Sequence, residues 1–209
     1  MGGKNEDTLA SAVRLVESGL YSEAVKVLKD FISQNPDSLE GYYNLGLALA
    51  ALGEREEAIN AYDEALAIDN MIFEVWFNKA TALYDLADFK AAKECYERAI
   101  DLRPDDAEAW NNLGNVYSRL GDGKQAIEAY TRAVLLDAEY AEAFYNKANA
   151  HFIEEEYERA VAYAELAIEL NPQLTERVKQ WIQVARDNVD MKQRHEERRK
   201  EREATNSRE

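Results

Sequence analysis

Residues 107–140 read AEAWNNLGNVYSRLGDGKQAIEAYTRAVLLDAEY, and this stretch decides the fold. Its first half carries apolar or small residues at helical spacing: Trp110, Leu113, Gly114 and Tyr117. Its second half repeats that pattern over residues 126–134, so each half predicts a helix with one apolar face. Gly121 lies between the halves, where a glycine typically ends a helix in the left-handed conformation. The stretch therefore predicts two antiparallel helices joined by a short turn.

The same pattern recurs along the chain with a period of 34 residues. One asparagine is found at four consecutive steps of that period: Asn44, Asn78, Asn112 and Asn146. The three prolines lie 68 residues apart, which is twice the period: Pro36, Pro104 and Pro172. This register divides residues 5–174 into five repeats: 5–38, 39–72, 73–106, 107–140 and 141–174. Such a period predicts stacked copies of one helical hairpin.

Small and large residues occupy fixed positions of the repeat, counted from its first residue. Position 20 is alanine in all five repeats: Ala24, Ala58, Ala92, Ala126 and Ala160. An aromatic residue occupies position 4 of the last four repeats: Tyr42, Trp76, Trp110 and Phe144. Position 24 is tyrosine in the middle three: Tyr62, Tyr96 and Tyr130. Large residues that face small ones favour close, interdigitated packing of helices.

Together with glycine or alanine at position 8 and proline at position 32, these residues resemble the tetratricopeptide repeat (TPR) family over residues 5–174. The resemblance implies an all-α fold, a right-handed α-solenoid of antiparallel helix pairs. The chain departs from the family pattern at a few positions. Lys79 and Lys147 replace the leucine of position 7, and Glu155 stands where the turn glycine is expected. These departures concern local packing and the shape of one turn.

The segments outside the repeats are expected to differ from each other. Residues 1–4 are expected to form a flexible N-terminus. Residues 175–191 are expected to form a capping helix, because Val178, Trp181 and Ile182 share one apolar stripe that would cover the last repeat. Residues 192–209 are highly charged, and their composition leaves open a helix in solvent or a disordered tail.

The chain has 209 residues and a formal net charge of −16, and the repeats carry the acidity. Eight Lys or Arg and seven Asp or Glu lie from Arg186 onward, a net charge of +1, so residues 1–185 carry −17. Nucleic acid is not an expected partner, because its phosphates require Lys and Arg. No run reaches the ~20 apolar residues of a membrane span, and the N-terminus lacks a signal peptide. With a single cysteine, the expected location is the cytoplasm.

Little in the sequence supports catalysis. His151 stands at position 11 of its repeat, where the family has an aromatic residue, so a packed histidine is expected. Cys95 has no histidine nearby to lower the pKa of its thiol. The acidic run 154–156 lacks the glycine and the spaced oxygen ligands of a calcium loop. We therefore expect no catalytic residue, no metal and no cofactor, and no enzyme.

In the TPR family the first helices line a concave groove that binds partner segments, and the resemblance implies the same surface here. Position 6 contributes a ladder of four amides: Asn44, Asn78, Asn112 and Asn146. Positions 5, 9 and 12 add further candidate peptide-binding residues: Tyr43, Leu47, Phe77, Thr81, Tyr84, Asn111, Asn115, Tyr145, Asn149 and Phe152. An amide has one acceptor and two donors, which suits an extended peptide backbone. The alternative is that the asparagines bond to a neighbouring repeat and that Tyr43 and Tyr145 fill the seam between repeats.

Position 2 is glutamate in every repeat, and four of these residues are expected at the groove edge: Glu40, Glu74, Glu108 and Glu142. Their carboxylates would attract basic ligands; alternatively, they only favour the helix dipole. A carboxylate clamp, as in chaperone-binding TPR domains, is not expected. The three cations of that clamp would fall on residues that are neither Lys nor Arg: Tyr43 or Phe77, Glu108 or Glu142, and Asn112 or Asn146.

These features predict a non-catalytic scaffold that binds a neutral-to-basic protein or peptide segment in the TPR groove. Two alternatives stay open. The first is a self-assembling protein that forms oligomers through the ends of the solenoid or through its tail. The second is a regulatory subunit of an enzyme complex, since TPR folds serve many unrelated processes.

Overall fold

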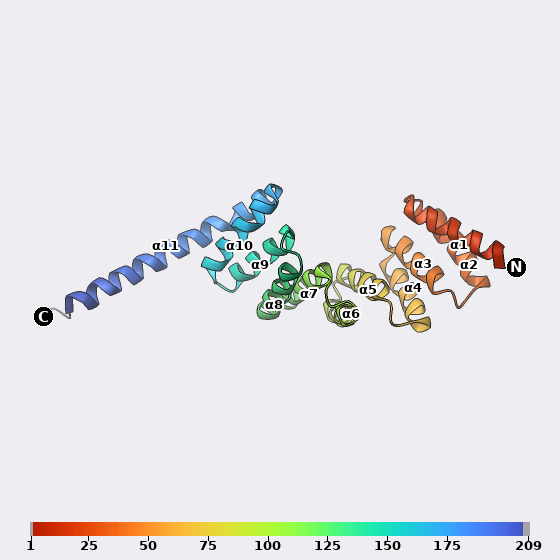
Figure 1. Ribbon diagram of the computed structural model, residues 1–209, viewed down its shortest axis with the longest axis horizontal. Coiled ribbons are helices and arrows are strands. Elements are labelled where there is room, and N and C mark those ends of the chain that lie inside the picture. Colours follow the sequence, from red (N-terminus) through yellow and green to blue (C-terminus); the bar gives the residue numbers. More distant parts are fainter. Residues whose placement is uncertain (1, 207–209) are drawn as a thin grey trace. The chain divides into compact units, whose positions relative to one another are not determined.

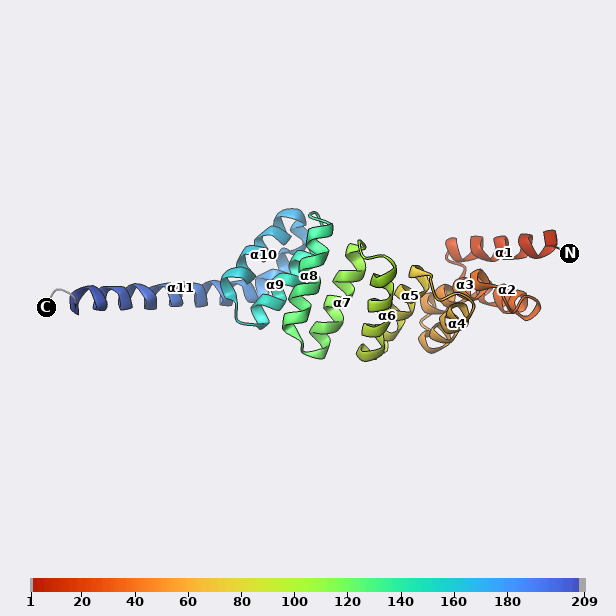
Figure 2. The ribbon, with the colours of Figure 1, turned by 60° about the horizontal axis from the view of Figure 1, so that its bottom comes forward.

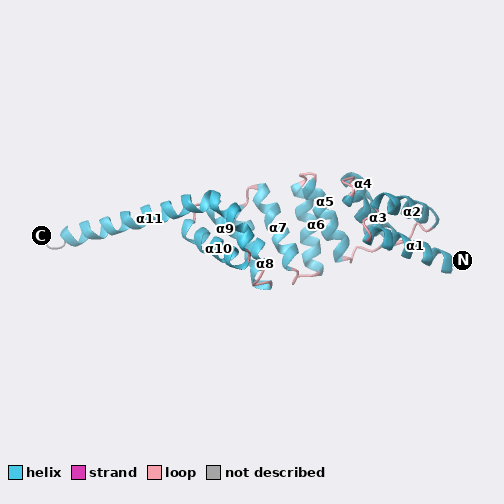
Figure 3. Ribbon diagram, turned by 90° about the horizontal axis from the view of Figure 1, so that it is seen from above, coloured by secondary structure: helices cyan, strands magenta, loops and turns pink. Residues whose placement is uncertain are grey.

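The computed structural model describes the chain from residue 2 to residue 206, and its side chains from residue 7 to residue 200 (Figure 1). Within these residues all regular structure is helical, as Figure 3 shows by colour. The prediction of an all-α fold built of antiparallel helix pairs is confirmed. The chain divides into two compact units, of which the first ends at Ala109 and the second begins at Trp110. Each unit is described by itself below.

The first unit contains three helix pairs. They are α1 (Gly2–Glu17) with α2 (Tyr21–Gln34), α3 (Leu39–Ala51) with α4 (Arg55–Ile68), and α5 (Phe73–Asp85) with α6 (Phe89–Leu102). Each helix packs against the next one in the chain. Residues 2–4, expected as a flexible segment, belong to α1, and Met1 lies outside the described residues. The first residues of α7 (Ala107–Leu120) also belong to this unit.

The second unit contains the rest of α7, then α8 (Gly123–Leu136), α9 (Ala141–Ile153) and α10 (Tyr157–Leu170). A short 3-10 turn (Pro172–Leu174) leads into the long helix α11 (Thr175–Asn206). Residues 175–191, expected as a cap, and residues 192–206 of the expected tail therefore form one helix. Figures 1 and 2 both show α11 continuing past α9 and α10. Residues 207–209 lie outside the described part of the chain.

Side-chain caps and left-handed residues delimit the helices. The side chains of Ser38, Asp88 and Asp122 each accept a hydrogen bond from a backbone N–H in the first turn of the next helix. Gly121 ends α7 with φ of +81°. Glu155, which replaces the turn glycine in the fifth repeat, adopts the left-handed conformation too, with φ of +60°. The turn of the fifth repeat therefore keeps the left-handed backbone conformation although Glu155 replaces the glycine.

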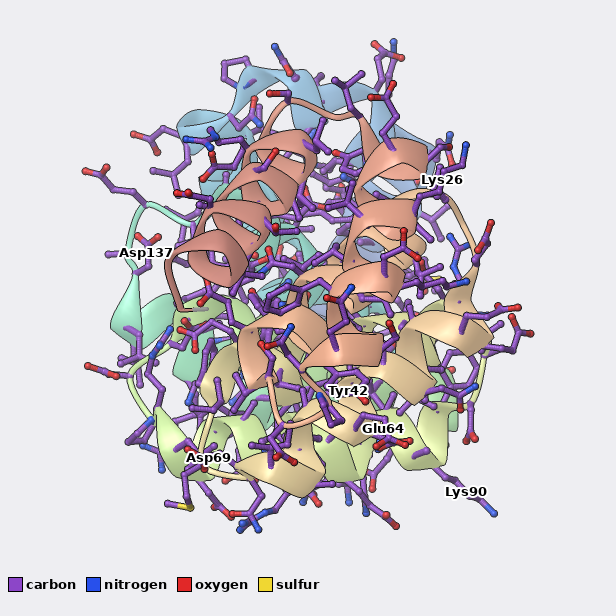
Figure 4. The ribbon with its side chains drawn as sticks, turned by 90° about the vertical axis from the view of Figure 1, so that its right-hand side faces the viewer. Lys26, Tyr42, Glu64, Asp69, Lys90 and Asp137 are labelled. Carbon is purple, nitrogen blue, oxygen red and sulfur yellow. The ribbon has the colours of Figure 1, made fainter. Side chains whose placement is uncertain are left out.

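In the second and fourth repeats, the core places a glycine of the first helix against a tyrosine of the second. A Cβ atom added to Gly46 would lie 2.4 Å from the ring of Tyr62, and one added to Gly114 would lie 2.5 Å from the ring of Tyr130. In the fifth repeat the tyrosine is replaced by Ala164, and Val178 and Ile182 of α11 complete that cluster. α11 thus serves as the cap that the last repeat needs. Charged side chains such as Lys26 and Lys90 point away from the helices (Figure 4).

Candidate functional site

The candidate binding residues lie on the first helices of the second to fifth repeats and form two patches, one in each unit. The N-terminal patch comes from α3 and α5: Tyr43, Asn44, Leu47, Phe77, Asn78, Thr81 and Tyr84. The C-terminal patch comes from α7 and α9: Asn111, Asn112, Asn115, Tyr145, Asn146, Asn149 and Phe152. All of these side chains are half-buried except Asn44 and Asn111, which are buried.

In the N-terminal patch the amide nitrogens of the ladder are bound internally. Asn44 Nδ2 donates to the carbonyl oxygen of Glu40 at 2.8 Å, and Asn78 Nδ2 donates to that of Glu74 at 2.7 Å. Asn78 Nδ2 also lies 3.4 Å from the hydroxyl of Tyr43. Because a carbonyl oxygen only accepts, these contacts fix which end of each amide is the nitrogen. The Oδ1 atoms of both residues have no partner among the described residues and remain as acceptors.

In the C-terminal patch the amides bond to one another. Asn146 Nδ2 donates to Asn111 Oδ1 at 2.9 Å, and Asn111 Nδ2 lies 3.4 Å from Asn112 Oδ1. Asn146 therefore contacts position 5 of the preceding repeat, as Asn78 does with Tyr43. Tyr130 donates its hydroxyl hydrogen to Asn115 Oδ1 at 2.8 Å. Asn78 and Asn146 thus bond to the preceding first helix, whereas Asn44 bonds within its own helix.

The aromatic residues of the N-terminal patch pack among themselves and keep part of their surface exposed. The Phe77 ring lies 5.5 Å from Phe73 and 5.7 Å from Tyr96, and the Tyr84 ring lies 5.3 Å from Phe89. Thr81 Oγ1 bonds to the Tyr96 hydroxyl at 2.9 Å. Burial raises the pKa of Tyr96 to about 12, so its hydroxyl stays protonated and the bond to Thr81 persists at neutral pH.

The aromatic residues of the C-terminal patch are partly covered by α11. The Arg177 guanidinium lies 4.0 Å from the centre of the Tyr145 ring, and the Trp181 ring lies 5.1 Å from Phe152. The Nε1 atom of Trp181 is buried and has no hydrogen-bond partner among the described residues. Arg177 and Trp181 were not expected at this patch. Trp181 lies on the apolar stripe of the capping helix, but nothing in the sequence indicated that this stripe reaches Phe152.

Two of the four groove-edge glutamates are neutralised by cations. Glu74 is hydrogen-bonded to the Arg103 guanidinium, which lowers the pKa of the Glu74 carboxyl. Glu142 Oε1 lies 2.7 Å from Arg177 Nη1. Glu40 and Glu108 make no ion pair with any described residue, and Glu40 is exposed. Of these four glutamates, Glu40 and Glu108 therefore keep a carboxylate without an ion pair among the described residues, and both lie in the first unit.

The titratable groups considered for catalysis are packed inside the repeats. His151 is 3% exposed, stacks on Tyr163 and bonds through Nδ1 to Glu156 Oε2 at 2.8 Å. Burial lowers the pKa of His151, so the neutral form is favoured. Burial also raises the pKa of the Cys95 thiol to about 11, which disfavours the reactive thiolate. The described residues contain no group of three or more His, Cys, Asp or Glu placed to hold a metal ion.

Comparison with known proteins places the chain in a family. A model of the tetratricopeptide repeat matches residues 9–70, 77–134 and 114–175. The chain belongs to the tetratricopeptide repeat family. The matched segments cover the five repeats read from the 34-residue period, apart from residues 5–8 and 71–76. No curated protein sequence matches the chain significantly. Among the described residues, no helix is both long enough and apolar enough to cross a membrane.

Solved structures share the fold. The structure of MamA from Desulfovibrio magneticus RS-1, residue 41 to the end, is 25% identical in sequence to this chain. The match has a TM-score of 0.78 and covers 83% of this chain and 98% of that chain. Another MamA protein is 23% identical, with a TM-score of 0.77 over 84% and 96% of the two chains. YrrB, described as a TPR protein with an unusual peptide-binding site, is 22% identical, with a TM-score of 0.74 over 83% and 90%. The chain is a protein-interaction repeat protein by family and fold.

Proposed function

We propose that the chain is a non-catalytic scaffold that binds an extended segment of another protein across the first helices of its repeats. The observation that carries the proposal is that Asn78 and Asn146 each direct the amide nitrogen to an internal acceptor. Their Oδ1 atoms are left at half-buried positions without a partner among the described residues, one in each patch. Such an acceptor suits a backbone N–H group of an extended segment, whatever its sequence. YrrB, with the same fold and a peptide-binding site in its description, supports this proposal.

The aromatic side chains beside the ladder supply the apolar part of the contact. Phe77 and Tyr84 in the N-terminal patch are half-buried and already ordered by packing against Phe73 and Phe89. Rigid rings lose little conformational entropy on binding, which makes them suitable anchors. We infer a neutral-to-basic ligand, because the unpaired carboxylates of Glu40 and Glu108 lie on the first helices of the same unit. The cytoplasm is the compartment we propose.

The test begins with selection of binders from a random library of twelve-residue peptides against the full chain. The best peptide is then measured by fluorescence anisotropy against Asn78→Ala, Asn112→Ala and Asn146→Ala. The outer surface of α4 offers a matched control, because Asn60 is an exposed asparagine on a second helix. We expect at least one ladder variant to weaken binding about tenfold, as loss of a buried polar contact does. Asn60→Ala should bind as the wild type does.

Circular dichroism of each variant separates loss of binding from loss of fold. If the helix content is unchanged and all three ladder variants bind the peptide as tightly as Asn60→Ala does, the ladder is structural only and the proposal is wrong. Failure to select any peptide from the library would also count against a general backbone-binding surface.

A further inference from the structure

The C-terminal part of α11 separates its charges onto two faces. At about 100° per residue, one set of basic residues falls within about 160° of the helix circumference. This basic face consists of Lys192, Arg194, His195, Arg198 and Arg199. The remaining charged residues between 192 and 200 lie on the opposite side: Glu196, Glu197 and Lys200. The glutamates that neighbour Arg198 in the sequence therefore do not neutralise it on the helix surface.

Two arginines of the basic face, Arg194 and Arg198, are exposed and make no ion pair with any side chain that the structure describes. Both lie C-terminal to Lys192, whose side chain pairs with Glu158 of α10. Figures 1 and 2 show α11 continuing past α9 and α10. A helix that presents unpaired arginines away from the repeats of its own unit is suited to contact another molecule.

Closer to its N-terminus, α11 already pairs with acidic residues of the fifth repeat. Arg186 Nη2 lies 2.8 Å from Glu165 Oε1, and Lys192 Nζ lies 2.7 Å from Glu158 Oε1. Glu158 and Glu165 stand at positions 18 and 25 of the fifth repeat, two turns apart on α10. The cations of α11 thus recognise one particular pair of repeat positions when both are acidic.

Helix α4 carries the same acidic pair. Positions 18 and 25 of the second repeat are Glu56 and Asp63. The other second helices each lack acid at one or both positions: Ser22 and Lys29, Lys90 and Glu97, Lys124 and Thr131. Glu56 is exposed and makes no ion pair with a described residue, whereas Asp63 pairs with Lys79. Glu56 is therefore the acidic residue that α4 leaves for a partner, because α5 already pairs with Asp63.

A groove of about 660 Å³ adjoins this surface between α4 and α6, with α5 beneath it. Its acidic lining residues come from both second helices: Asp63, Glu94, Glu97 and Asp101. Its floor includes the apolar side chains of Ile59, Trp76 and Leu83. Lys79 and Arg98 also line it, but each is paired with one of the acidic residues, Asp63 and Asp101. The groove therefore has acidic groups on both walls.

We propose that the basic face of α11 in one copy docks on α4 and the α4–α6 groove of a second copy. The chain supplies both partners of this contact, because residues 1–185 carry a net charge of −17 and the following segment carries +1. Charge complementarity of this kind directs association and fixes orientation. Every copy carries both an α11 and an α4, so each copy can supply either side of the contact. This inference goes beyond peptide binding on the first helices, which involves other surfaces.

The test is sedimentation velocity of the full chain in about 50 mM and about 500 mM NaCl, where screening differs strongly. We expect concentration-dependent oligomers in low salt that dissociate in high salt. Arg194→Glu with Arg198→Glu should weaken association about tenfold or more, and Glu56→Lys with Glu94→Lys should do the same. The matched control, Glu196→Gln with Glu197→Gln, changes only the opposite face of α11 and should not weaken association.

An equimolar mixture of the two charge-reversed proteins provides the decisive arm. Each reversed surface then meets a complementary one, so association should return although neither protein associates alone. A wild-type chain that stays monomeric in low salt would overturn the proposal. Association that survives both charge reversals, or a mixture that fails to associate, would overturn it as well. Loss of library-peptide binding in these variants would concern the proposed function instead, so the two proposals fail separately.

Discussion

The close contact between Gly114 and Tyr130 leads to a stability prediction whose size follows from the structure. A Cβ atom at residue 114 would lie 2.5 Å and 2.6 Å from two ring carbons of Tyr130. The ring is 3% exposed, and its hydroxyl donates to Asn115 at 2.8 Å, so it cannot move without losing a hydrogen bond. Overpacking of a core costs about 1–3 kcal/mol and the lost hydrogen bond about 1 kcal/mol. Alanine gains about 1 kcal/mol over glycine in a helix. Gly114→Ala should therefore destabilise the protein by about 1–3 kcal/mol.

The effect of Gly114→Ala on stability should change sign when Tyr130 is replaced by leucine. The first repeat pairs Ala12 with Leu28 at the same two positions, and both are fully buried there. In a Tyr130→Leu background the new methyl group fills space, so Gly114→Ala should stabilise the protein by about 1 kcal/mol through helix propensity. The two effects differ by about 2–4 kcal/mol, a coupling well above the error of a double-mutant cycle.

Urea denaturation followed by circular dichroism measures all four proteins. Gly121→Ala is the control: residue 121 has φ of +81° and no atom near a built Cβ, so its effect should be equal in both backgrounds. Equal effects of Gly114→Ala with tyrosine and with leucine at residue 130 would refute the packing argument, as would stabilisation by Gly114→Ala in the wild type.

Three further predictions address the buried polar groups. Burial lowers the pKa of His151, so the stability that its neutral form contributes is complete above the unfolded pKa of about 6.5 and is lost as the pH falls below that value. Between pH 7 and pH 5.5, the free energy of unfolding of His151→Phe, measured by urea denaturation, should therefore fall less than that of the wild type. Asn146→Ala leaves the buried Asn111 Oδ1 unpaired and should lower stability by about 1–3 kcal/mol, whereas Asn149→Ala should change it by less than about 0.5 kcal/mol; similar values for the two would contradict the tether between repeats. Because Cys95 is 5% exposed and the pKa of its thiol is about 11, it should react with a thiol reagent at mildly alkaline pH far more slowly in the folded protein than in urea, and equal rates would disprove its burial.

The helices were predictable from the sequence because each repeat carries the same pattern of residues. The apolar stripes and the small residues at positions 8 and 20 agree in five copies, and the turn glycine is present in three, so a departure such as Glu155 does not change the result. Glu155 keeps the left-handed turn because the helices on both sides of it are held by packing, which outweighs the local preference for glycine.

The candidate site was predictable only as a set of positions. The sequence places the asparagines on one face, but it contains no signal for the direction in which each amide points. That direction depends on hydrogen bonds to the backbone carbonyl of Glu40 or Glu74 and to the side chain at position 5 of the preceding repeat. Likewise, the glutamates at position 2 are equivalent in the sequence, but in the structure Arg103 pairs with Glu74 and Arg177 pairs with Glu142. Long side chains reach different neighbours from equivalent positions, and a repeat pattern does not encode this.

The side-chain amide resonances of the asparagines test the central claim most directly. In a titration of the labelled full chain with a library-selected peptide, the account predicts shifts of the Nδ2 resonances of Asn78, Asn112 and Asn146. It predicts no shift for Asn60 on α4 or Asn188 on α11, which lie on other helices. Shifts confined to residues of the second helices, with the ladder amides unchanged at saturation, would contradict binding across the first helices.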